Sequence, residues 1–231
     1  MKLLSFDTSS KIFSLALSDN GKIVRYRNLE LGKQLSSDIT KYIRDILKSV
    51  DWTLNDLDGF AVGVGPGSFT SLRVGLATVK ALALALDKPI VGICSLDLIA
   101  MNASRDFQHV CVINDARRDL VYAAFYDLTS EGNFRRGGDY LLTDLRTVIT
   151  KIKKKFAILG DAVTMIEEAD RVRLLKLGCE ISEDERRWYP KAQNLSKAVE
   201  ERFQNKKFDD PNKLVPMYLH ADDCQINRGN R

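Results

Sequence analysis

A short run of small polar residues closes the first apolar stretch of the chain and is the first candidate for chemistry. Asp7, Thr8 and Ser9 end a predicted strand over residues 3–7 and begin the turn after it. In such a turn, hydroxyl and backbone N–H groups can donate to a phosphate, and an aspartate can hold a hydrated magnesium ion. The same residue types also stabilise a tight turn without a ligand. By themselves they favour the tight turn, with the phosphate site as the alternative.

A glycine-rich loop within residues 63–75, Gly-Val-Gly-Pro-Gly-Ser-Phe-Thr-Ser-Leu-Arg-Val-Gly, leads into a long apolar stretch. Ser68 is a favourable N-cap for a helix there, and the N–H groups at a helix N-terminus can bind an anion. Gly65 and Gly67 permit the close approach of a ligand or of another backbone segment. The segment lacks the lysine of a Walker loop and the G-x-G-x-x-G spacing. A phosphate cradle and a structural turn are therefore equal alternatives.

One dense polar cluster separates two predicted strands in the second half of the chain: Asp115, Arg117, Arg118 and Asp119. The two adjacent arginines could bind a phosphate or a carboxylate. Flanking aspartates more commonly hold such residues in a turn through ion pairs. We expect the turn and keep anion binding as the alternative.

The familiar catalytic constellations are missing from the sequence. It has no G-x-S-x-G, H-x-x-x-H or H-E-x-x-H, and no cysteine has a histidine near it in sequence. The four cysteines show no C-x-x-C spacing, and the two histidines, His109 and His220, lack a ligand partner at helical spacing. We therefore expect reduced thiols, no metal site built by this chain and no catalytic residue.

Composition indicates a folded protein of one large domain or two small lobes, with 231 residues and 45% hydrophobic content. The apolar stretch 74–86 contains Lys80 and falls short of the roughly 20 residues that cross a bilayer. Asp7 interrupts the N-terminal apolar run before a signal sequence could be completed. We expect no membrane span, no export and a cytoplasmic location.

The charge balance gives only weak support to direct RNA binding. The net charge of +4, from 35 basic and 31 acidic residues, is ordinary for a soluble protein. The basic runs 151–155 and 186–187 have no interleaved aromatic residues except Phe156, Trp188 and Tyr189. A dedicated single-strand RNA surface is therefore not predicted.

The first half of the chain predicts strands followed by a strand, helix, strand unit. Alternating patterns and turn residues indicate a three-stranded meander over residues 3–7, 12–18 and 23–29. An amphipathic helix follows over residues 36–50. A strand at 59–64, a helix at 68–86 and a strand at 90–93 come next. A right-handed crossover would make these last two strands parallel in one sheet.

The second half begins again with strands. These are expected at 109–114, 120–126, 134–142 and 156–159, with helices from near Asp144 and Asp161. The polar segment at 104–108 marks a boundary, and a further amphipathic helix is expected near 191–205. We predict an N-terminal lobe over 1–104 completed by that helix, a C-terminal lobe over 105–190, and a tail over 206–231 with a mobile end. The repeated order of sheet and then helices fits a duplicated architecture.

The helix at 68–86 carries apolar residues around most of its circumference, more than one packed face requires. Its small residues would let a partner helix come close, and the helix at 36–50 has a similarly wide apolar stripe. We predict that the two helices form an interface with a partner; burial by the second lobe is the alternative. The predicted interface residues are Leu35, Ile39, Tyr42, Ile43, Ile46, Thr70, Arg73, Val74, Ala77, Thr78 and Ala81.

Four motifs together resemble a known family. They are Asp-Thr-Ser at 7–9, Gly-Pro-Gly-Ser-Phe-Thr-Ser-Leu-Arg-Val-Gly at 65–75, Asp-Ala-Arg-Arg at 115–118 before Val-Tyr-Ala-Ala, and Pro-Met-Tyr-Leu at 216–219. On these motifs the chain resembles the bacterial TsaB (YeaZ) family over essentially its whole length. The motif at 65–75 is the most specific of them.

The resemblance implies an α/β, two-lobed fold of the actin, Hsp70 and sugar-kinase (ASKHA) type, each lobe a mixed sheet with flanking helices. It also implies a non-catalytic subunit that pairs with TsaD and TsaE to place threonylcarbamoyl on adenosine 37 of tRNA. Alone, such a chain is expected to form a homodimer, and tRNA is contacted through the complex. TsaD holds its metal through paired histidines on its first helix, and residues 34–50 contain none.

The chain departs from the family pattern at two places. Ser71 stands where glycine is usual, which would slightly crowd a close approach at the helix head, and Gly32-Lys33 stands where a histidine is frequent. The competing hypothesis is a small ASKHA-type ATPase or phosphotransferase acting alone on magnesium ATP. We expect no required cofactor, with ATP or ADP at the partner interface as a secondary prediction. The candidate nucleotide contacts are Asp7, Thr8, Ser9, Gly65, Gly67 and Ser68.

Overall fold

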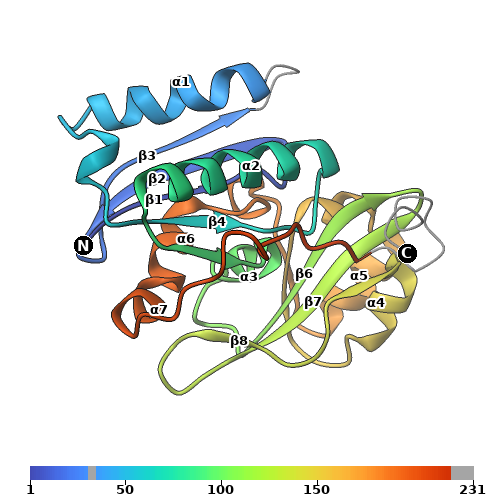
Figure 1. The fold of residues 1–231 in the computed structure, drawn as a ribbon. Coiled ribbons are helices and arrows are strands. Elements are labelled where there is room, and N and C mark those ends of the chain that lie inside the picture. Colours follow the sequence, from blue (N-terminus) through green and yellow to red (C-terminus); the bar gives the residue numbers. More distant parts are fainter. Residues whose placement is uncertain (31–34, 220–231) are drawn as a thin grey trace. The chain divides into compact units, whose positions relative to one another are not determined.

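The computed structural model describes residues 1–30 and 35–219, and side chains only from residue 38 onward in the first helix. The described chain divides into two compact units. The first comprises Met1–Met101 and Tyr189–Met217, and the second comprises Asn102–Trp188, with Tyr218 and Leu219 grouped with it (Figure 1). The chain thus leaves the first unit once and returns to it.

The first unit is built on a five-stranded sheet in the order β3-β2-β1-β4-β5. β1, β2 and β3 form the antiparallel meander that the alternating patterns predicted, and β4 and β5 lie parallel to β1. Parallel strands require a crossover, which α2 supplies between β4 and β5. The strands are β1 (Lys2–Asp7), β2 (Ile12–Asp19), β3 (Lys22–Glu30), β4 (Gly59–Gly63) and β5 (Ile90–Ile93).

Both faces of this sheet are covered. Phe6, Phe13 and Val62 lie in a buried cluster with α1 and α2, whereas Leu3, Ala61 and Val91 pack with α6 and α7 on the other face (Figure 1). The alternation of side chains along each strand produces these two cores. The helices are α1 (Leu35–Lys48), η1 (Leu54–Asp56), α2 (Phe69–Leu86), α3 (Ser95–Ala100), α6 (Ala192–Ala198) and α7 (Glu200–Gln204). The single helix expected near 191–205 is therefore two helices joined at Val199.

The segment 206–217 belongs to the first unit and is not the separate tail that the sequence suggested. The Asp209 carboxylate accepts a 2.7 Å hydrogen bond from the Gly92 N–H and a 2.8 Å hydrogen bond from the Arg202 guanidinium. The Met217 N–H donates to the Val64 carbonyl at 2.8 Å, and Leu214 and Met217 pack against the core. This segment runs beside β5, an edge strand whose backbone groups need partners. The residues from 220 onward, including the end predicted to be mobile, lie outside the described residues.

The second unit is built on a six-stranded sheet in the order β11-β10-β6-β7-β8, with β9 also paired to β7. The strand expected at 134–142 is interrupted at Gly137 and Gly138, so that β8 and β9 pair with opposite ends of β7. Glycine has no side chain to pack and often marks such a break. The elements are β6 (His109–Arg117), β7 (Leu120–Leu128), β8 (Phe134–Arg136), β9 (Leu141–Asp144), α4 (Leu145–Lys151), β10 (Ala157–Leu159), η2 (Asp161–Met165), α5 (Glu168–Lys176), β11 (Glu180–Ile181) and η3 (Glu185–Arg187).

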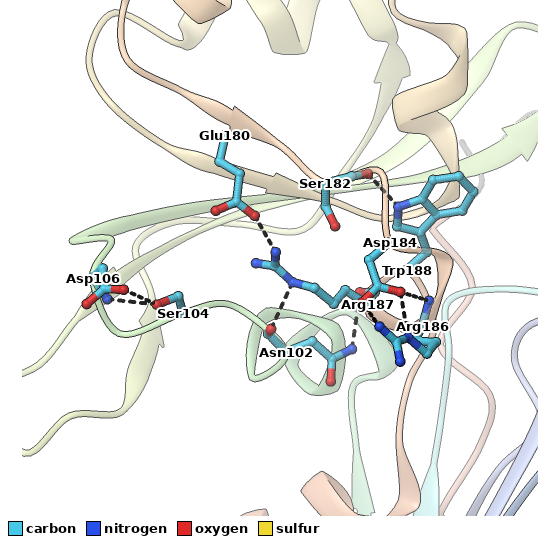
Figure 2. Close-up of polar contacts among 9 residues, drawn as sticks. All are labelled: Asn102, Ser104, Asp106, Glu180, Ser182, Asp184, Arg186, Arg187 and Trp188. Atoms are coloured by element: carbon cyan, nitrogen blue, oxygen red, sulfur yellow. Dashed lines mark hydrogen bonds and ion pairs between the residues drawn. The ribbon is translucent and has the colours of Figure 1, made fainter.

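The two ends of the second unit are fastened to each other. The Asn102 side-chain amide donates to the Arg187 carbonyl at 3.2 Å, and the Arg187 Nε donates to the Asn102 carbonyl at 3.3 Å. Arg187 also pairs with Glu180, and the Trp188 indole donates to the Ser182 carbonyl at 2.7 Å, as Figure 2 shows. The segments that enter and leave this unit are therefore held side by side.

Candidate functional site

The turn after β1 is closed upon itself. The Asp7 side chain is fully buried, and its Oδ1 accepts 2.7 Å hydrogen bonds from the Ser9 N–H and the Ser9 hydroxyl. Its Oδ2 accepts a 2.6 Å hydrogen bond from the Ser95 hydroxyl, which belongs to the first turn of α3. Both carboxyl oxygens are thus used by groups of this chain.

Burial raises the pKa of the Asp7 carboxyl above its ordinary value, and the hydrogen bonds from Ser95 and Ser9 offset this only in part. The neighbouring groups are engaged as well. The Thr8 hydroxyl donates to the Ser71 carbonyl at 2.8 Å, and the Ser9 carbonyl accepts the Ser68 N–H at 2.7 Å. The turn after β1 and the head of α2 therefore satisfy each other's polar groups.

The glycines of the loop permit this close packing. A Cβ at Gly63 would collide with the Asp7 carboxylate, one at Gly67 with the Ser9 carbonyl, and one at Gly75 with the Thr8 side chain. These glycines hence provide room for another part of the chain, one of the two uses that the sequence allowed.

The nucleotide contacts proposed at Asp7, Thr8 and Ser9 stay a prediction, and the geometry of this turn does not favour them. All three side chains are buried, and a hydrated magnesium ion would need carboxylate oxygens that are open to water. Gly65 is also buried, whereas Gly67 is half-buried and Ser68 is exposed. The structural turn is the interpretation that the geometry supports.

Ser71, the departure from the family pattern, is compatible with this packing. It lies in the first turn of α2, and its hydroxyl accepts a 3.0 Å hydrogen bond from the Ser68 hydroxyl. Its backbone is helical, so no glycine is required there. The other departure, Gly32-Lys33, lies outside the described residues.

α2 presents a long exposed face. Leu72, Leu76 and Val79 are buried in the core of the first unit, and only 28% of the helix is buried inside the structure. Side chains three or four positions apart lie on one face of a helix. Five exposed residues follow that spacing on the opposite face: Thr70, Arg73, Ala77, Ala81 and Leu84.

The borders and chemistry of this face are well defined. Val74 and Thr78 are half-buried at its edge, and the Thr78 hydroxyl donates to the Val74 carbonyl at 2.9 Å. The Arg73 guanidinium lies 3.7 Å from the centre of the Phe69 ring. We call Thr70, Arg73, Ala77, Ala81 and Leu84 the α2 outer face.

Among the described residues, only α2 is long and apolar enough to span a bilayer, a test that the core helix of a soluble protein also passes.

Three of the α1 residues predicted for an interface lie instead in the core of their own unit. Ile39, Ile43 and Ile46 are 1%, 3% and 0% exposed because they face the sheet of their own unit. Tyr42 packs at the border of the same core, with its ring 5.9 Å from that of Phe13. The outward residues of α1 are polar or charged: Thr40, Lys41, Arg44 and Lys48. The side chain of Leu35 lies outside the described residues.

Two residues of these sites were missed by sequence reasoning. Leu84, 57% exposed, lies three positions beyond Ala81, the last predicted interface residue, and that spacing was visible in the sequence. Ser95 completes the Asp7 turn from 88 residues away, and no local pattern signals such a contact.

The polar cluster between β6 and β7 is a strained hairpin turn. Arg117, Arg118 and Asp119 have φ values of 68°, 53° and 59°, which few residues other than glycine adopt. Asp115 accepts a 2.7 Å hydrogen bond from the Arg117 N–H and lies 3.3 Å from its guanidinium. The Asp115 N–H in turn donates to Asp161 at 2.8 Å, and burial raises the pKa of the Asp161 carboxyl. An aspartate-held turn, as expected, is present.

Cysteine and metal chemistry are limited in the described residues. Cys94, Cys111 and Cys179 are buried and form no disulfide bond, and burial raises the pKa of Cys111 far above its ordinary value. No group of three histidine, cysteine or carboxylate side chains that could hold a metal occurs in residues 1–30 and 35–219.

A protein-family model matches more than half of the chain. The family model for TsaD, tRNA N6-adenosine threonylcarbamoyltransferase, matches residues 30–170, which is more than half of the chain. The chain belongs to the TsaD family. The resemblance to its TsaB (YeaZ) members, inferred from the four motifs, is confirmed by the relatives described next.

The TsaB proteins of Escherichia coli and Bacillus subtilis, each named a tRNA threonylcarbamoyladenosine biosynthesis protein, are among these relatives. The E. coli protein is 32% identical over 57% of this chain and 58% of its own length. The B. subtilis protein is 29% identical over 74% of this chain and 68% of its own length. The match therefore spans a little over half of the E. coli relative.

A solved structure, YeaZ from Pseudomonas aeruginosa, has the same fold. It is 24% identical, with a TM-score of 0.78, and the match covers 94% of this chain and 99% of that chain. The two mixed sheets with flanking helices are those of the ASKHA-type fold that the family resemblance implied.

Proposed function

We propose that this chain is a non-catalytic, cytoplasmic subunit of the machinery that forms threonylcarbamoyladenosine in tRNA. It pairs with TsaD, and works with TsaE, for transfer of threonylcarbamoyl to adenosine 37. Membership of the TsaD family and the printed names of the TsaB relatives support this assignment. The α2 outer face is the observation that carries it.

The α2 outer face has the composition of a helix-packing surface. Ala77 and Ala81 lie one turn apart and leave room for a second helix to approach closely. Leu84, more than half exposed, supplies a large apolar anchor at one end, and Thr70 and Arg73 supply polar groups at the other. Interfaces commonly combine an apolar centre with polar edges in this way.

A related chain is the natural occupant of this face. The match to the TsaD family model covers residues 30–170 and so includes α2, and we expect TsaD to present a corresponding helix. Two such helices would pack with their small residues facing each other, as in an isologous interface. In the absence of TsaD, a second copy of this chain would occupy the face and form a homodimer.

The closed Asp7 turn supports a non-catalytic role. An ATPase or phosphotransferase of this fold needs phosphate-binding donors and a metal-binding carboxylate open to solvent, whereas here those groups bind Ser9, Ser71 and Ser95. No cofactor is required of this chain in the proposal. Any ATP or ADP at the partner interface would have to bind outside the Asp7 turn, and tRNA is contacted through the complex.

Ala77→Glu tests the pairing. Ala77 is exposed, and glutamate is a good helix former, so the substitution should leave the fold intact. In the complex it would bury an unpaired charge, which costs about 3–5 kcal/mol, or at least a hundredfold in affinity. Sedimentation of the purified chain with TsaD measures this loss. Val172→Glu, at a residue 42% exposed on α5 of the second unit, is the matched control and should pair normally.

An Ala77→Glu chain that pairs with TsaD as tightly as the wild type would place the interface elsewhere and overturn the proposal. A modification assay with TsaD, TsaE, tRNA and the threonylcarbamoyl donor adds a functional measurement. We expect product with the wild-type chain and with Val172→Glu, and little product without the chain or with Ala77→Glu. ATP turnover by the isolated chain would favour the enzyme hypothesis instead.

A further inference from the structure

Three cation–aromatic pairs lie in the second unit. The Lys155 ammonium lies 4.7 Å from the centre of the Phe107 ring, and the Arg105 guanidinium lies 4.6 Å from the Phe134 ring. The Arg136 guanidinium lies 4.0 Å from the Tyr140 ring. Contacts of this kind hold a basic side chain over a ring through the electrostatic attraction of the ring face. We call these six residues the cation–aromatic row.

The three pairs adjoin one another. Arg105 and Phe107 share the loop before β6, so the first two pairs are joined through that loop. Phe134 and Arg136 are two residues apart on β8, so they lie on the same face of the strand. The Leu128 N–H donates to the Gln108 carbonyl at 2.9 Å, which holds the loop beside the end of β7 that pairs with β8. The three pairs therefore come from neighbouring segments of the second unit.

Within residues 1–30 and 35–219, the basic side chains of this region form no ion pair with a carboxylate. Elsewhere in the unit, Arg171, Arg173 and Arg187 form ion pairs with Glu183, Asp170 and Glu180. In the row and its sequence neighbours, six exposed basic side chains form no ion pair within the described residues: Arg105, Arg135, Arg136, Lys153, Lys154 and Lys155.

The nearby carboxylates do not cancel this charge. Asp106 accepts a 2.7 Å hydrogen bond from the Ser104 hydroxyl, as Figure 2 shows, and Asp127 lies 2.6 Å from the His109 ring nitrogen. Glu131 and Asp139, in the loops on either side of β8, are two further carboxylates, and Glu180, next to Phe156, is paired with Arg187. Within the described residues the six cations thus stay without an ion-pair partner, beside three rings that are half-buried.

We propose that the cation–aromatic row is a binding surface for the sugar-phosphate backbone of RNA, with the half-exposed rings available for base stacking. A cation laid over a ring is already ordered, so less side-chain entropy is lost when its remaining N–H groups bind a phosphate. Rings beside cations are the combination that single-stranded nucleic acid uses, since every base has a flat apolar face. An anionic lipid surface or an acidic peptide would use the charges but not the rings.

The identity of the RNA as tRNA rests on the proposed function; the RNA surface itself rests on the row alone. This surface is hard to predict from the sequence, because the basic run at 151–155 has no aromatic neighbour in sequence except Phe156. The rings come from residues 107, 134 and 140, which the fold of the second unit brings to the cations.

The test compares RNA binding by two variants of equal charge. The row variant replaces Arg105, Arg136 and Lys155 by glutamine. The control variant replaces Lys22, Arg25 and Arg27, three exposed basic residues of β3 in the first unit, by glutamine. Fluorescence anisotropy with a labelled, unmodified transcript of a tRNA that reads codons beginning with A gives the affinity at several salt concentrations. The same titration with anionic phospholipid vesicles tests a lipid surface.

We expect the row variant to bind the transcript at least tenfold more weakly. The slope of log affinity against log salt concentration should also fall in magnitude by about two, because each lost phosphate contact lowers that slope by roughly 0.7 to 0.9. The β3 control should bind like the wild type. Equal binding by the row variant and the wild type would overturn the proposal. Equal losses of RNA affinity in both variants would also overturn it, because they would indicate an effect of overall charge. A row variant that loses only vesicle binding would overturn it as well.

Pairing with TsaD and thermal unfolding are measured on the same proteins, so that this proposal and the proposed function can fail separately. The row variant should unfold like the wild type and pair with TsaD normally, yet the complex that contains it should bind the transcript more weakly. If the wild-type chain does not pair with TsaD, the proposed function fails, and the titration of the isolated chain still decides the RNA surface. A complex with unchanged affinity for the transcript overturns the row even where pairing holds.

Discussion

The hydroxyl of Ser95 donates a 2.6 Å hydrogen bond to Oδ2 of Asp7 across 88 residues of chain. The same Oγ accepts the Gly65 N–H at 3.0 Å, and the Ser95 N–H donates to the Gly65 carbonyl at 2.7 Å. One serine therefore joins the end of β1, the glycine-rich loop and the start of α3. Both oxygens of the Asp7 carboxyl are therefore hydrogen-bonded by groups of this chain.

This arrangement predicts how stability depends on pH. Because the pKa of Asp7 is raised in the folded chain, folding binds a proton at this site between the ordinary aspartate value of 3.8 and the folded value. The contribution of Asp7 to stability is therefore complete below the ordinary value and is lost as pH rises through the folded pKa. Other carboxylates, such as Asp144, whose pKa is lowered by its bonds to Thr147, have the opposite dependence.

Asp7→Asn isolates the effect of Asp7. An asparagine retains an acceptor for Ser9 and can donate its amide to Ser95, but it has no charge to bury. We expect the stability of the wild type relative to Asp7→Asn to fall as pH rises from about 4, and the variant to be at least as stable at pH 7. Urea unfolding from pH 4 to pH 8 measures the difference. A difference that does not change with pH would contradict the raised pKa.

The close packing of the glycine loop leads to a second prediction. Gly63→Ala would force a Cβ into the Asp7 carboxylate, a collision with a buried group that cannot move into solvent. We expect a loss of about 3 kcal/mol or more in the free energy of unfolding, as for other severe core overpacking. Gly138→Ala is the control, because nothing lies within 4 Å of a Cβ at that position. Equal stabilities of the two variants would refute the packing argument.

Local patterns in the sequence were sufficient to predict most elements but not their partners. The period-two and period-3.6 patterns gave the β1–β3 meander, α1, β4, α2 and β5 close to their bounds. The break at Val199, and the division of the predicted 134–142 strand, depend on packing and on a glycine pair whose effect is set by the neighbouring β7. The type of each element could be predicted from its pattern, but the surface against which its apolar side packs could not.

The candidate sites also combine features that local patterns predict with tertiary contacts that they do not. The apolar stripe of α1 is wide, as the sequence indicated. Its buried residues pack against the sheet of their own unit, where they cover Phe6 and Phe13. Whether a stripe faces inward or outward depends on neighbours far along the chain. The link between Asp7 and Ser95, and the pairing of Lys155 with Phe107, are likewise tertiary contacts without a local signal.

The hairpin turn between β6 and β7 gives a third prediction. Arg117 pairs with Leu120, so Arg118 and Asp119 form a two-residue loop with both φ values positive, the type I′ geometry that Asn-Gly favours. A non-glycine residue in this conformation costs about 1 kcal/mol. The double variant Arg118→Asn with Asp119→Gly should therefore gain about 1–2 kcal/mol in urea unfolding. Arg118→Lys, which keeps the charge and the β-carbon, should show no gain; a double variant no more stable than wild type would contradict the strain.

The exposure of Leu84 separates a partner-binding role from a packing role on the same helix. Leu76, 3% exposed, is in the core, so Leu76→Ala should lose about 2–5 kcal/mol of stability. Leu84 is 57% exposed, so Leu84→Ala should unfold within about 0.5 kcal/mol of the wild type. If the α2 outer face binds TsaD, however, Leu84→Ala should weaken that pairing about tenfold, the effect of removing an apolar anchor of about 1–2 kcal/mol. Sedimentation and urea unfolding of both variants make the comparison, and a Leu84→Ala chain with full affinity would remove Leu84 from the interface.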